Sequence, residues 1–454
     1  MSCARFHEPS LARITFDESK RMIKKWLKYL LLSVSGLLLI LLLYVFAPGL
    51  WHRWVTYPRL EKNLIAFQEL RKEPPALTAL NTYRGVMHAH SYWSHDSEGT
   101  LASIIPAAKS TGMDFIFLTD HPHGNSDSIP RGYKGYYDGV LVEPGSEKQG
   151  FCTWPLDSAV IDWSEDKDTV VKKVVSNGGI IFYAHSEEPH HWDNPDYQGM
   201  EIYNIHTDTK DESLPGHIVN FIVNGNQYRH WALREMFDEQ TSILTLWDSL
   251  NSRRKLVGFS AVDAHENQNI RARYLKDGRI EWLGPNANPI DTVELSFWNR
   301  WLFHKPDEDG WIFKFLIDTY ETSFNHVTNY VVADTLSVSS LGHHLKRGNL
   351  FIAFKGLGDA QGFMYCSRDA ADKVNGILGD SVRVDQVRSL HAVSPLPGQF
   401  RLIRDGKTVH VSSENEYVFT WSAPVEKGVY RMEVHINLSG DQVPWIYSNP
   451  IYVF

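Results

Sequence analysis

The stretch GVMHAHSYWSHDSEGT, Gly85–Thr100, gathers side chains that commonly bind metal ions. Within nine residues it holds His88, His90, His95 and Asp96. Because alternate side chains of a strand point to one face, His88 and His90 would point the same way on a strand and could hold one ion. A solvated polar loop would have the same composition. Metal-binding residues elsewhere in the chain would favour the metal site over the polar loop.

Short apolar runs alternate with helix-like segments from about Thr82 onward. Two segments, TLASIIPAAKSTG and DKDTVVKKVVSNGG, have helical spacing. The alternation predicts an α/β fold with a parallel sheet or barrel, and such folds build active sites at the carboxyl ends of their strands. The strand-like runs that end in polar residues are FIFLTD (Phe115–Asp120), GIIFYAH (Gly179–His185), GMEIYN (Gly199–Asn204) and LVGFSAVDAH (Leu256–His265).

The polar residues at these strand ends are the partners that the opening stretch needs. TDH supplies Asp120 and His121, GSE supplies Glu147, YAH supplies His185, and VDAH supplies Asp263 and His265, again two apart. Each cluster alone could be a cap or a satisfied polar group. Five such clusters, each at the end of a predicted strand, together indicate a multinuclear metal site. Glu201 is either a support residue of that site or simply a strand-end acid.

The order of these motifs resembles that of the PHP (polymerase and histidinol phosphatase) superfamily of metallohydrolases. The resemblance covers roughly residues 82–358 and implies a distorted (β/α)7 barrel with up to three metal ions at its C-terminal face. The family pattern of HxH, an acid or His, TDH, Glu, AH and DxH is matched by His88-Ala89-His90, Asp96, Asp120-His121, Glu147, Ala184-His185 and Asp263-Ala264-His265.

The resemblance also implies how the ions are held. One ion would be bound by His88, His90, Glu147 and Asp263; a second would share Glu147 and take His185; a third would use Asp96, His121 and His265. Two or three divalent ions are expected, and Zn, Mn and Fe all suit such ligands. Family members usually have another histidine shortly after the bridging glutamate, but Lys148–Ala184 contains none, so His206 is the candidate substitute. His95 is one residue off the matched position and is expected to point away or toward substrate.

The activity implied is phosphoester hydrolysis by a metal-activated water. Asp120, or His265 if it is not a metal ligand, is expected to move the leaving-group proton. Arg271 and Arg273 are candidates to hold the phosphate, or else ordinary surface arginines. The substrate expected is an anionic small molecule or a lipid-linked phosphoester. Two alternatives stay open: a metal-dependent amide, carbamate or ester hydrolase, and a metal-stabilised envelope binding protein without turnover, which the missing histidine favours.

The N-terminus has the features of a membrane anchor. Tyr29–Phe46 is uncharged and Leu-rich, and it extends to Trp51, which is enough to cross a bilayer as a helix. Five Lys and Arg residues between Lys20 and Lys28 place the N-terminus in the cytoplasm by the positive-inside rule. We expect a cytoplasmic tail (1–28), an uncleaved anchor (29–51) of the cytoplasmic (inner) membrane and a stalk (52–81), with the catalytic domain (82–358) outside, in the periplasm.

The last segment, 359–454, changes to alternation of apolar and polar residues with period two. Asp405-Gly406 lies between two such runs in QFRLIRDGKTVHV and is a hairpin signal. Together with SVRVDQV, EYVFTWS and GVYRMEVHI, the pattern predicts a small antiparallel β-sandwich. This appended sandwich looks like that of the PHP branch that includes carbamate-hydrolysing members, which is the basis of the carbamate alternative.

Three further features bound the interpretation. The net charge of -9 argues against a nucleic-acid partner. Cys152 and Cys366 are far apart in sequence and are expected to be unpaired. Lys210–Arg254 has a helical pattern and is an insertion or lid, and the aromatic run Ser296–Phe313 is expected to be core, with a substrate groove or a bilayer contact as alternatives.

Overall fold

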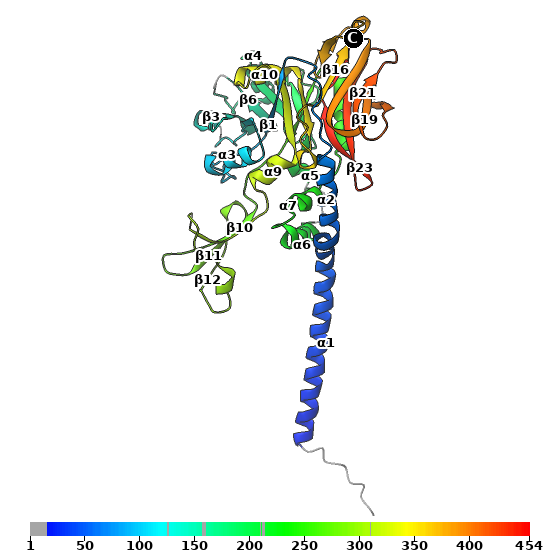
Figure 1. Cartoon of the computed structure of the whole chain (residues 1–454). Coiled ribbons are helices and arrows are strands. Elements are labelled where there is room, and N and C mark those ends of the chain that lie inside the picture. Colours follow the sequence, from blue (N-terminus) through cyan, green and yellow to red (C-terminus); the bar gives the residue numbers. More distant parts are fainter. Residues whose placement is uncertain (1–15, 125–126, 157–159, 209, 211–213, 309) are drawn as a thin grey trace, which may run out of the picture.

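The computed structural model describes residues 16–454 except 125–126, 157–159, 209, 211–213 and 309. Figure 1 shows a mixed α/β body, one long helix that leads away from it, and a small β-lobe that extends from the body in the same direction as that helix. Most of the predicted cytoplasmic tail, including Cys3, lies outside the described residues.

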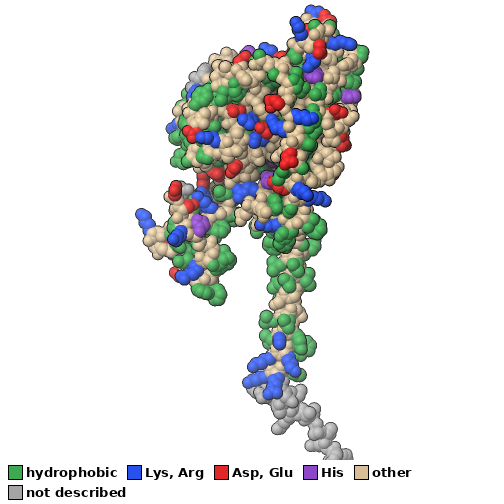
Figure 2. All heavy atoms as spheres, viewed as in Figure 1, with side chains coloured by type: hydrophobic (Ala, Val, Ile, Leu, Met, Phe, Trp, Pro, Cys, Tyr) green, Lys and Arg blue, Asp and Glu red, His purple; other side chains and the backbone are tan. Residues whose placement is uncertain are grey.

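The long helix is formed by α1 (Phe16–Trp51), a π-helical turn η1 (His52–Thr56) and α2 (Tyr57–Gln68). Its most apolar window has a mean hydropathy of 2.7 and is not buried at all. Within the described residues this is the one helix long and apolar enough to cross a membrane. The residues that precede the apolar segment are basic, as Figure 2 shows at its far end.

The strands that carry the predicted site belong to two sheets. In one, β1 is parallel to β2 and β2 to β4, while β14 is antiparallel to β1. In the other, β7, β8 and β9 are parallel neighbours, and β5 and β6 extend the sheet antiparallel. The strands are β1 (Asn81–Met87), β2 (Phe115–Phe117), β3 (Gly135–Tyr137), β4 (Val140–Glu143), β5 (Ser146–Lys148), β6 (Phe151–Trp154), β7 (Ile180–Tyr183), β8 (Gly199–Asn204), β9 (Val257–Ala261), β14 (Thr328–Ala333) and β15 (Leu350–Ala353).

Two isolated bridges join these sheets just beyond the strand ends. Ala89, past the end of β1, pairs in parallel with Ala264, past the end of β9. Asp120, past the end of β2, pairs in parallel with Ser146 in β5. The chain segments that follow β1, β2 and β9 are therefore neighbours, although they are far apart in sequence.

The helices pack on the faces of these sheets and on the outer end of α1. Val170, Val171 and Val174 bury one face of α4, as their helical spacing predicts. The helices are α3 (Leu101–Ser110), α4 (Lys167–Ser176), α5 (Ile205–Asp208), α6 (Leu214–Asn224), α7 (Arg229–Arg234), α8 (Thr241–Asn251), α9 (Tyr320–His326) and α10 (Val338–Arg347).

The hairpin formed by α6 and α7 attaches the body to the long helix. The side chain of Asn224 donates to the carbonyl oxygen of Gly49 at 3.0 Å, and Arg53 donates to the carbonyl of Val223 at 2.9 Å. The indole of Trp231 donates to Glu61 in α2 at 2.6 Å. Polar contacts at both ends of η1 thus hold the helix against the body.

The C-terminal strands continue the first sheet and pair antiparallel, except that β18 and β24 are parallel. β15 pairs with β23, so the sheet runs without a break from the site-bearing strands into the C-terminal region. The turn at Asp405 and Gly406 has positive φ at both residues, 48° and 75°, as the Asp-Gly signal predicts. The strands are β16 (Met364–Arg368), β17 (Val374–Ile377), β18 (Ser381–Val382), β19 (Ser389–Arg404), β20 (Lys407–Val411), β21 (Glu416–Trp421), β22 (Gly428–Leu438), β23 (Asp441–Ser448) and β24 (Ile451–Val453).

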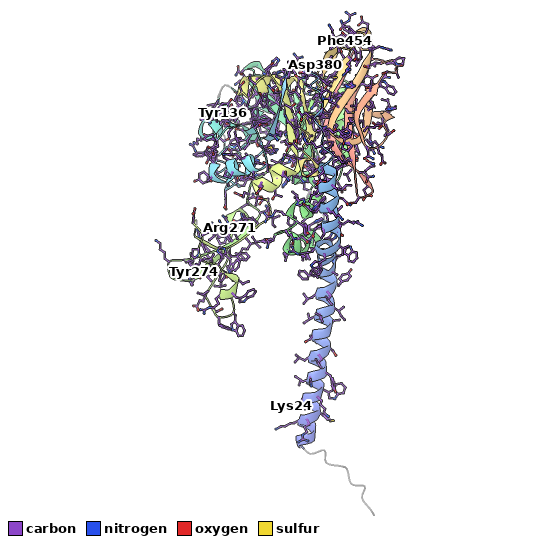
Figure 3. All side chains as sticks on the ribbon, in the orientation of Figure 1. Lys24, Tyr136, Arg271, Tyr274, Asp380 and Phe454 are labelled. Atoms are coloured by element: carbon purple, nitrogen blue, oxygen red, sulfur yellow. The ribbon has the colours of Figure 1, made fainter. Side chains whose placement is uncertain are left out.

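The lobe is a separate four-stranded sheet, residues 269–316, in the order β12-β11-β10-β13. Ala272, Ile280 and Ile312 form its small buried core. It leaves the body after Glu266 and returns at Asp318, and Figure 3 shows Arg271 and Tyr274 on it. Its strands are β10 (Asn269–Tyr274), β11 (Ile280–Leu283), β12 (Pro289–Val293) and β13 (Trp311–Leu316).

The α/β class and the four strand-like runs of the sequence are confirmed, and two expectations are wrong. SVRVDQV is a strand only at Ser381–Val382, because Val384–Gln386 turns into a 3-10 helix. The aromatic run is not core throughout: Ile312 is buried, but Trp298 is 81% exposed because it lies on the connection between β12 and β13. Cys152 and Cys366 are both buried, free thiols.

Candidate metal centre

The loops beyond β1 and β9 are held together by backbone hydrogen bonds. Asp263 N–H donates to the carbonyl of His88 at 2.8 Å, and His90 N–H donates to the carbonyl of Ala264 at 2.9 Å. The hydroxyl of Tyr320 donates to the carbonyl of His90 at 2.6 Å. The HxH and DxH motifs are thereby fixed side by side.

One group of four candidate ligands is fully buried: His88, His90, Glu147 and Asp263. Nε2 of His88 lies 3.0 Å from Oε2 of Glu147 and 3.2 Å from Oδ1 of Asp263. Nε2 of His90 lies 3.3 Å from each of the same two oxygens. Two imidazole nitrogens and two carboxylate oxygens therefore converge on one point, which is a donor set for a divalent cation.

A second group adjoins the first and shares His90 with it: His90, Asp96, His121 and His265. Oδ2 of Asp96 lies 3.4 Å from Nε2 of His121 and 3.4 Å from Nε2 of His265. The rings of His90 and His265 stack with centroids 3.9 Å apart. The structure thus brings together the three residues assigned to a third ion by the resemblance.

His185 faces the other oxygen of Glu147. Its Nε2 lies 3.1 Å from Oε1 of Glu147 and 3.7 Å from Oδ2 of Asp263. The ring of His206 lies beside it, with centroids 5.8 Å apart. Glu147 therefore has one oxygen toward His88 and His90 and the other toward His185, the arrangement of a bridging carboxylate.

In three site histidines, the Nδ1 atom, which faces away from the ligand carboxylates, has a hydrogen-bond partner. Nδ1 of His88 donates to Oε1 of Glu201 at 2.5 Å, Nδ1 of His121 to the carbonyl of Glu147 at 3.1 Å, and Nδ1 of His265 to the carbonyl of Asp263 at 2.8 Å. With Nδ1 as the donor, Nε2 is the nitrogen that faces the carboxylates and that can bind a metal ion once its proton is lost. Such outer partners set the tautomer and orientation of metal-binding histidines.

Glu201 is a support residue rather than an isolated strand-end acid. Besides holding His88, its Oε2 accepts from the backbone N–H of His185 at 2.8 Å and from Asn204 at 2.8 Å. Cys152 lies 3.9 Å from Oε1, and burial raises the pKa of its thiol, so it stays protonated. One glutamate therefore positions two histidines of the centre.

The charges of the site are strongly coupled. Burial opposes ionisation of Glu147 and Asp263, but the histidines around them, His88 first, hold the pKa of both carboxyls well below the usual range. Burial likewise opposes protonation of His121 and His185, yet the hydrogen bonds to Asp96 and Glu147 raise the pKa of each to about 9. A divalent cation would supply the positive charge that these protons supply here.

Two observations of the structure fit a bound cation. Nε2 of His90 and Oδ1 of Asp263 are buried and make no hydrogen bond with the described residues, which is costly unless an ion satisfies them. His88, His185 and Asp263 all have positive φ, 59°, 49° and 47°. Non-glycine residues persist in this strained region where the surroundings impose it, often at functional sites. Both features fit ligands that a metal holds in place.

The left-handed backbone of His88 differs from the extended conformation expected for the HxH motif. β1 ends at Met87, so His88 and His90 lie just beyond the strand. Their Nε2 atoms still face the same two oxygens, because the hydrogen bonds to the Asp263–His265 segment set the direction of the chain. The side chains converge for a different reason than strand alternation.

The residues expected to transfer protons and to hold phosphate have structural partners. Both oxygens of Asp120 accept from Ser91, its N–H at 2.5 Å and its hydroxyl at 2.8 Å, and burial raises the pKa of Asp120. Arg271 pairs with Glu98 at 2.5 Å, and Arg273 pairs with Glu281 at 2.7 Å. Their roles in catalysis, like the proton transfer by His265, stay predictions.

Lys210 is a cation of the site region that the sequence did not single out. Its ammonium group donates to Glu187 at 2.7 Å, and Glu187 lies 3.8 Å from Nδ1 of His185. Burial works against its charge, but Glu187, Glu188 and Asp263 raise the pKa of Lys210. No motif marks it, because Lys210 lies beyond the end of α5 and outside the strand-end pattern. His95 is 65% exposed and lies 4.0 Å from Asp96.

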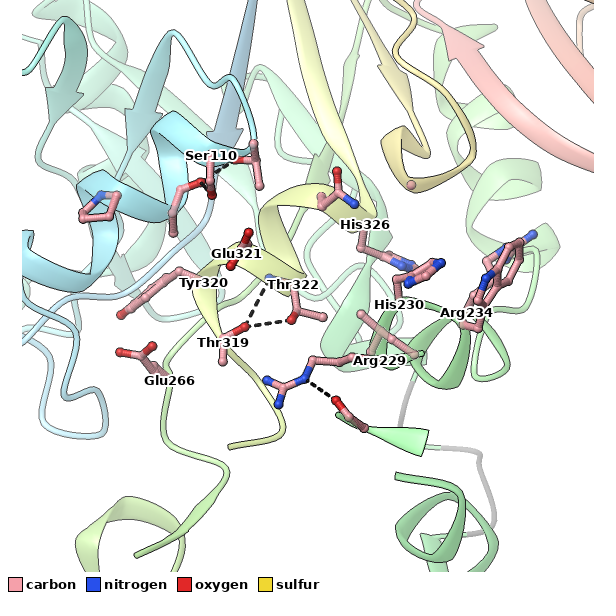
Figure 4. Close-up of a pocket in the computed structure, with 18 of the residues that line it drawn as sticks. Ser110, Arg229, His230, Arg234, Glu266, Thr319, Tyr320, Glu321, Thr322 and His326 are labelled. Carbon is pink, nitrogen blue, oxygen red and sulfur yellow. Dashed lines mark hydrogen bonds between the residues drawn. The ribbon is translucent and has the colours of Figure 1, made fainter. Parts of the chain in front are cut away.

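A cavity of about 910 Å³ lies next to the centre (Figure 4). Its described lining comes mainly from α3, α7 and α9, with Glu266, Phe354 and the turn at 225–227, and includes none of the candidate metal ligands. Tyr320 lines the cavity and also donates its hydroxyl to His90, so this one residue touches both. The cavity therefore lies behind the loops that carry the ligands.

Comparisons with known proteins add a distant structural likeness. No protein-family model matches the chain, and no curated protein matches it. The structure is similar to the crystal structure of a two-domain protein containing a predicted PHP-like metal-dependent phosphoesterase from Bacteroides vulgatus ATCC 8482, with 13% sequence identity and a TM-score of 0.31. The match covers 83% of this chain and 98% of that one. At these values the likeness does not establish a shared activity.

Proposed function

We propose that the chain is a membrane-anchored, metal-dependent phosphoesterase whose catalytic part lies outside the cytoplasmic membrane. The observation that carries the proposal is the pair of adjoining ligand groups that share His90, together with Glu147, whose second oxygen faces His185. Neighbouring cation sites of this kind are typical of hydrolases that act on phosphate esters. The order of the motifs, which resembles that of the PHP superfamily, supports the choice of phosphoesters.

Divalent ions held by these residues, Zn, Mn or Fe, would supply a nucleophilic water at neutral pH and positive charge for the anionic oxygens of the ester. Residues of the chain orient the histidines that would hold these ions. Glu201 fixes His88 with Nε2 toward the site, and the carbonyls of Glu147 and Asp263 do the same for His121 and His265. His206, beside His185, would complete the ligands of the second ion.

The fold proposed for this function is a distorted seven-stranded barrel followed by a β-sandwich. The two bridges, Ala89 with Ala264 and Asp120 with Ser146, support closure of a ring through β1, β2, β5, β6, β7, β8 and β9. We place the catalytic domain at 82–358, the sandwich at 359–454, the stalk at 52–81 and the anchor at 29–51. The basic residues before the apolar segment of α1 support an inside N-terminus.

The test is a substrate screen on the metal-loaded full chain in detergent. Phosphomonoesters and phosphodiesters are compared with carboxylic esters, amides and carbamates, and the Glu147→Gln variant is the matched control for contaminating activity. The proposal expects phosphoester hydrolysis that is lost in the variant. Hydrolysis of carbamates or carboxylic esters alone would favour the alternative enzyme, and two or more bound ions without any turnover would favour the binding protein.

A further inference from the structure

The lobe carries an apolar surface on the connection between β12 and β13. Phe297 is 75% exposed and Trp301 is 76% exposed, with Trp298 between them still more exposed. The indole of Trp301 donates to the carbonyl of Trp298 at 2.7 Å, so the loop is ordered by its own hydrogen bond rather than by burial. The lobe's core lies behind it, where Phe303 and Phe313 pack. Contiguous exposed aromatics of this size mark a contact surface.

The position of this surface indicates what it contacts. In Figure 1 the lobe extends beside the long helix, in the direction that α1 takes away from the body. Figure 2 shows hydrophobic side chains at the free end of the lobe and along α1. If α1 crosses a bilayer, the lobe extends toward that bilayer. The free end of the lobe and α1 therefore both expose apolar atoms on the side that faces it.

Other exposed apolar residues lie at the outer end of α1, apart from the lobe. Trp51 and Trp54 are 62% and 69% exposed, and Ile218 and Ile222 on α6, which packs against α1, are 49% and 56% exposed. Trp at the ends of a span is typical of the boundary between lipid headgroups and acyl chains. Three segments distant in sequence thus expose apolar residues around one end of the proposed span.

We propose that Phe297, Trp298 and Trp301 rest in the outer leaflet of the bilayer that α1 crosses, as a second membrane contact of the protein. The inference rests on the membrane anchoring in the proposed function. Exposed Arg300, within the same loop, suits the anionic headgroups that neighbour such aromatics. At this depth the rings of Trp and Phe are buried among acyl chains, and the indole N–H of Trp stays close to polar partners.

Two contacts would fix the orientation of the body on the membrane. The cavity described above lies between them: Glu266 and Thr319, near the two ends of the lobe, line one side, and Arg229 and His230 of α7 line another (Figure 4). With both the lobe and the α6–α7 hairpin on the bilayer, this cavity is held on the side of the body that faces the headgroups.

The test is depth-dependent quenching in proteoliposomes made with the full chain. A Cys3→Ser background leaves two buried cysteines, so an environment-sensitive fluorophore can be placed at Trp298→Cys, Leu38→Cys in α1, or Val411→Cys on β20. The quencher is a phosphatidylcholine with a nitroxide on its upper acyl chain. We expect several-fold stronger quenching at position 298 than at the exposed control position 411.

The outcomes separate the lobe contact from the anchor. Quenching at position 38 but only control-level quenching at 298 overturns the lobe contact and leaves the anchor standing. No quenching at either position overturns both. If the fluorophores at 298 instead transfer energy between chains, a second copy covers the surface and the bilayer assignment is overturned. A Trp301→Ser change should weaken quenching at 298 while hydrolysis of a soluble phosphoester in detergent stays unchanged.

Discussion

Two buried clusters of histidine and carboxylate in the described chain are neutralised in different ways. In the C-terminal region, Glu239, Glu433 and His435 come close enough to hold an ion, but Arg431 donates to Glu433, and the hydroxyl of Tyr447 donates to Glu239 at 2.6 Å. The protein itself therefore supplies the cation. Its one buried atom without a hydrogen bond among the described residues is a ring nitrogen of His435.

In the candidate metal centre, no Lys or Arg among the described residues forms an ion pair with the ligand carboxylates. In the described chain, the ion pairs of Glu147, Asp263 and Asp96 all go to histidines. A buried carboxylate oxygen, Oδ1 of Asp263, has no hydrogen bond there, and three ligand residues have positive φ. Convergence of His and Glu is therefore not enough: the cluster suited to a metal is the one whose carboxylates have only histidines as ion-pair partners and whose ligand residues have strained backbone.

The largest effect is expected from Glu147→Gln. The amide removes the carboxylate charge that faces His88 and His90 on one side and His185 on the other, so we expect loss of bound metal and a fall in phosphoester hydrolysis of about a thousandfold or more, which corresponds to roughly 4 kcal/mol. Elemental analysis and initial rates measure both. Glu433→Gln is the matched control and should change neither; equal loss in the two variants would remove the distinction between the clusters.

Arg431→Met should break the other cluster without touching metal binding. Arg431 pairs with Asp248 at 2.7 and 2.9 Å and with Glu433, and its side chain is almost fully buried. Asp248 would be left largely buried without its cation and Glu433 with His435 alone, at a cost of about 3–5 kcal/mol in the free energy of unfolding. Denaturant titration measures this loss. A variant of unchanged stability would show that Arg431 is not the cation that neutralises the cluster.

The same cluster predicts a dependence of stability on pH. Burial opposes ionisation of Glu433, but His435 and Arg431 lower its pKa to about 2. Because the folded pKa is below the unfolded one, the contribution is complete above the unfolded pKa of about 4.5 and is lost as pH falls toward 2, by roughly 3 kcal/mol. Unfolding free energies of wild type and Glu433→Gln, measured with chelator present, should converge over this window. Parallel curves would contradict the assignment.

Removal of metal should destabilise only the first cluster. A bound ion at a hundred times its dissociation constant stabilises the folded state by about 2.7 kcal/mol. We expect a chelator to lower the thermal midpoint of the wild type and of Glu433→Gln, but to leave Glu147→Gln unmoved. A chelator effect of equal size on all three chains would mean that the stabilising ion binds elsewhere.

The smallest effect is expected from Glu201→Gln. The variant keeps every ligand but weakens the partner of Nδ1 of His88, so metal affinity should fall about 10- to 100-fold while metal can still be restored at high concentration. Competition with a fluorescent chelator gives the affinity. An unchanged affinity would mean that the backbone alone orients His88.

Part of this architecture is readable in the sequence. The parallel strands and the convergence of the HxH, TDH, Glu, AH and DxH motifs follow from local pattern, because strand ends of an α/β fold meet at one edge. The left-handed φ of His88 is set by hydrogen bonds to the Asp263–His265 segment, which local pattern does not reveal. The exposure of Trp298 was missed, because an aromatic run has the same composition whether it is covered or not.

The C-terminal cluster could not be predicted either. Glu239 precedes α8 and Glu433 lies in β22, and no motif connects them. Their approach depends on the pairing of β15 with β23, which carries the sheet across the predicted domain boundary. Long-range pairing of this kind depends on the packing of whole elements, so it cannot be predicted from the identity of single residues.

The most direct test of the central claim is a titration of the metal-free full chain with a divalent ion, followed by phosphoester hydrolysis. The account predicts no hydrolysis without metal, activity that rises as two to three ions bind per chain, and no recovery in Glu147→Gln. Full occupancy without hydrolysis of any phosphoester, or equal activity before and after metal removal, would contradict it.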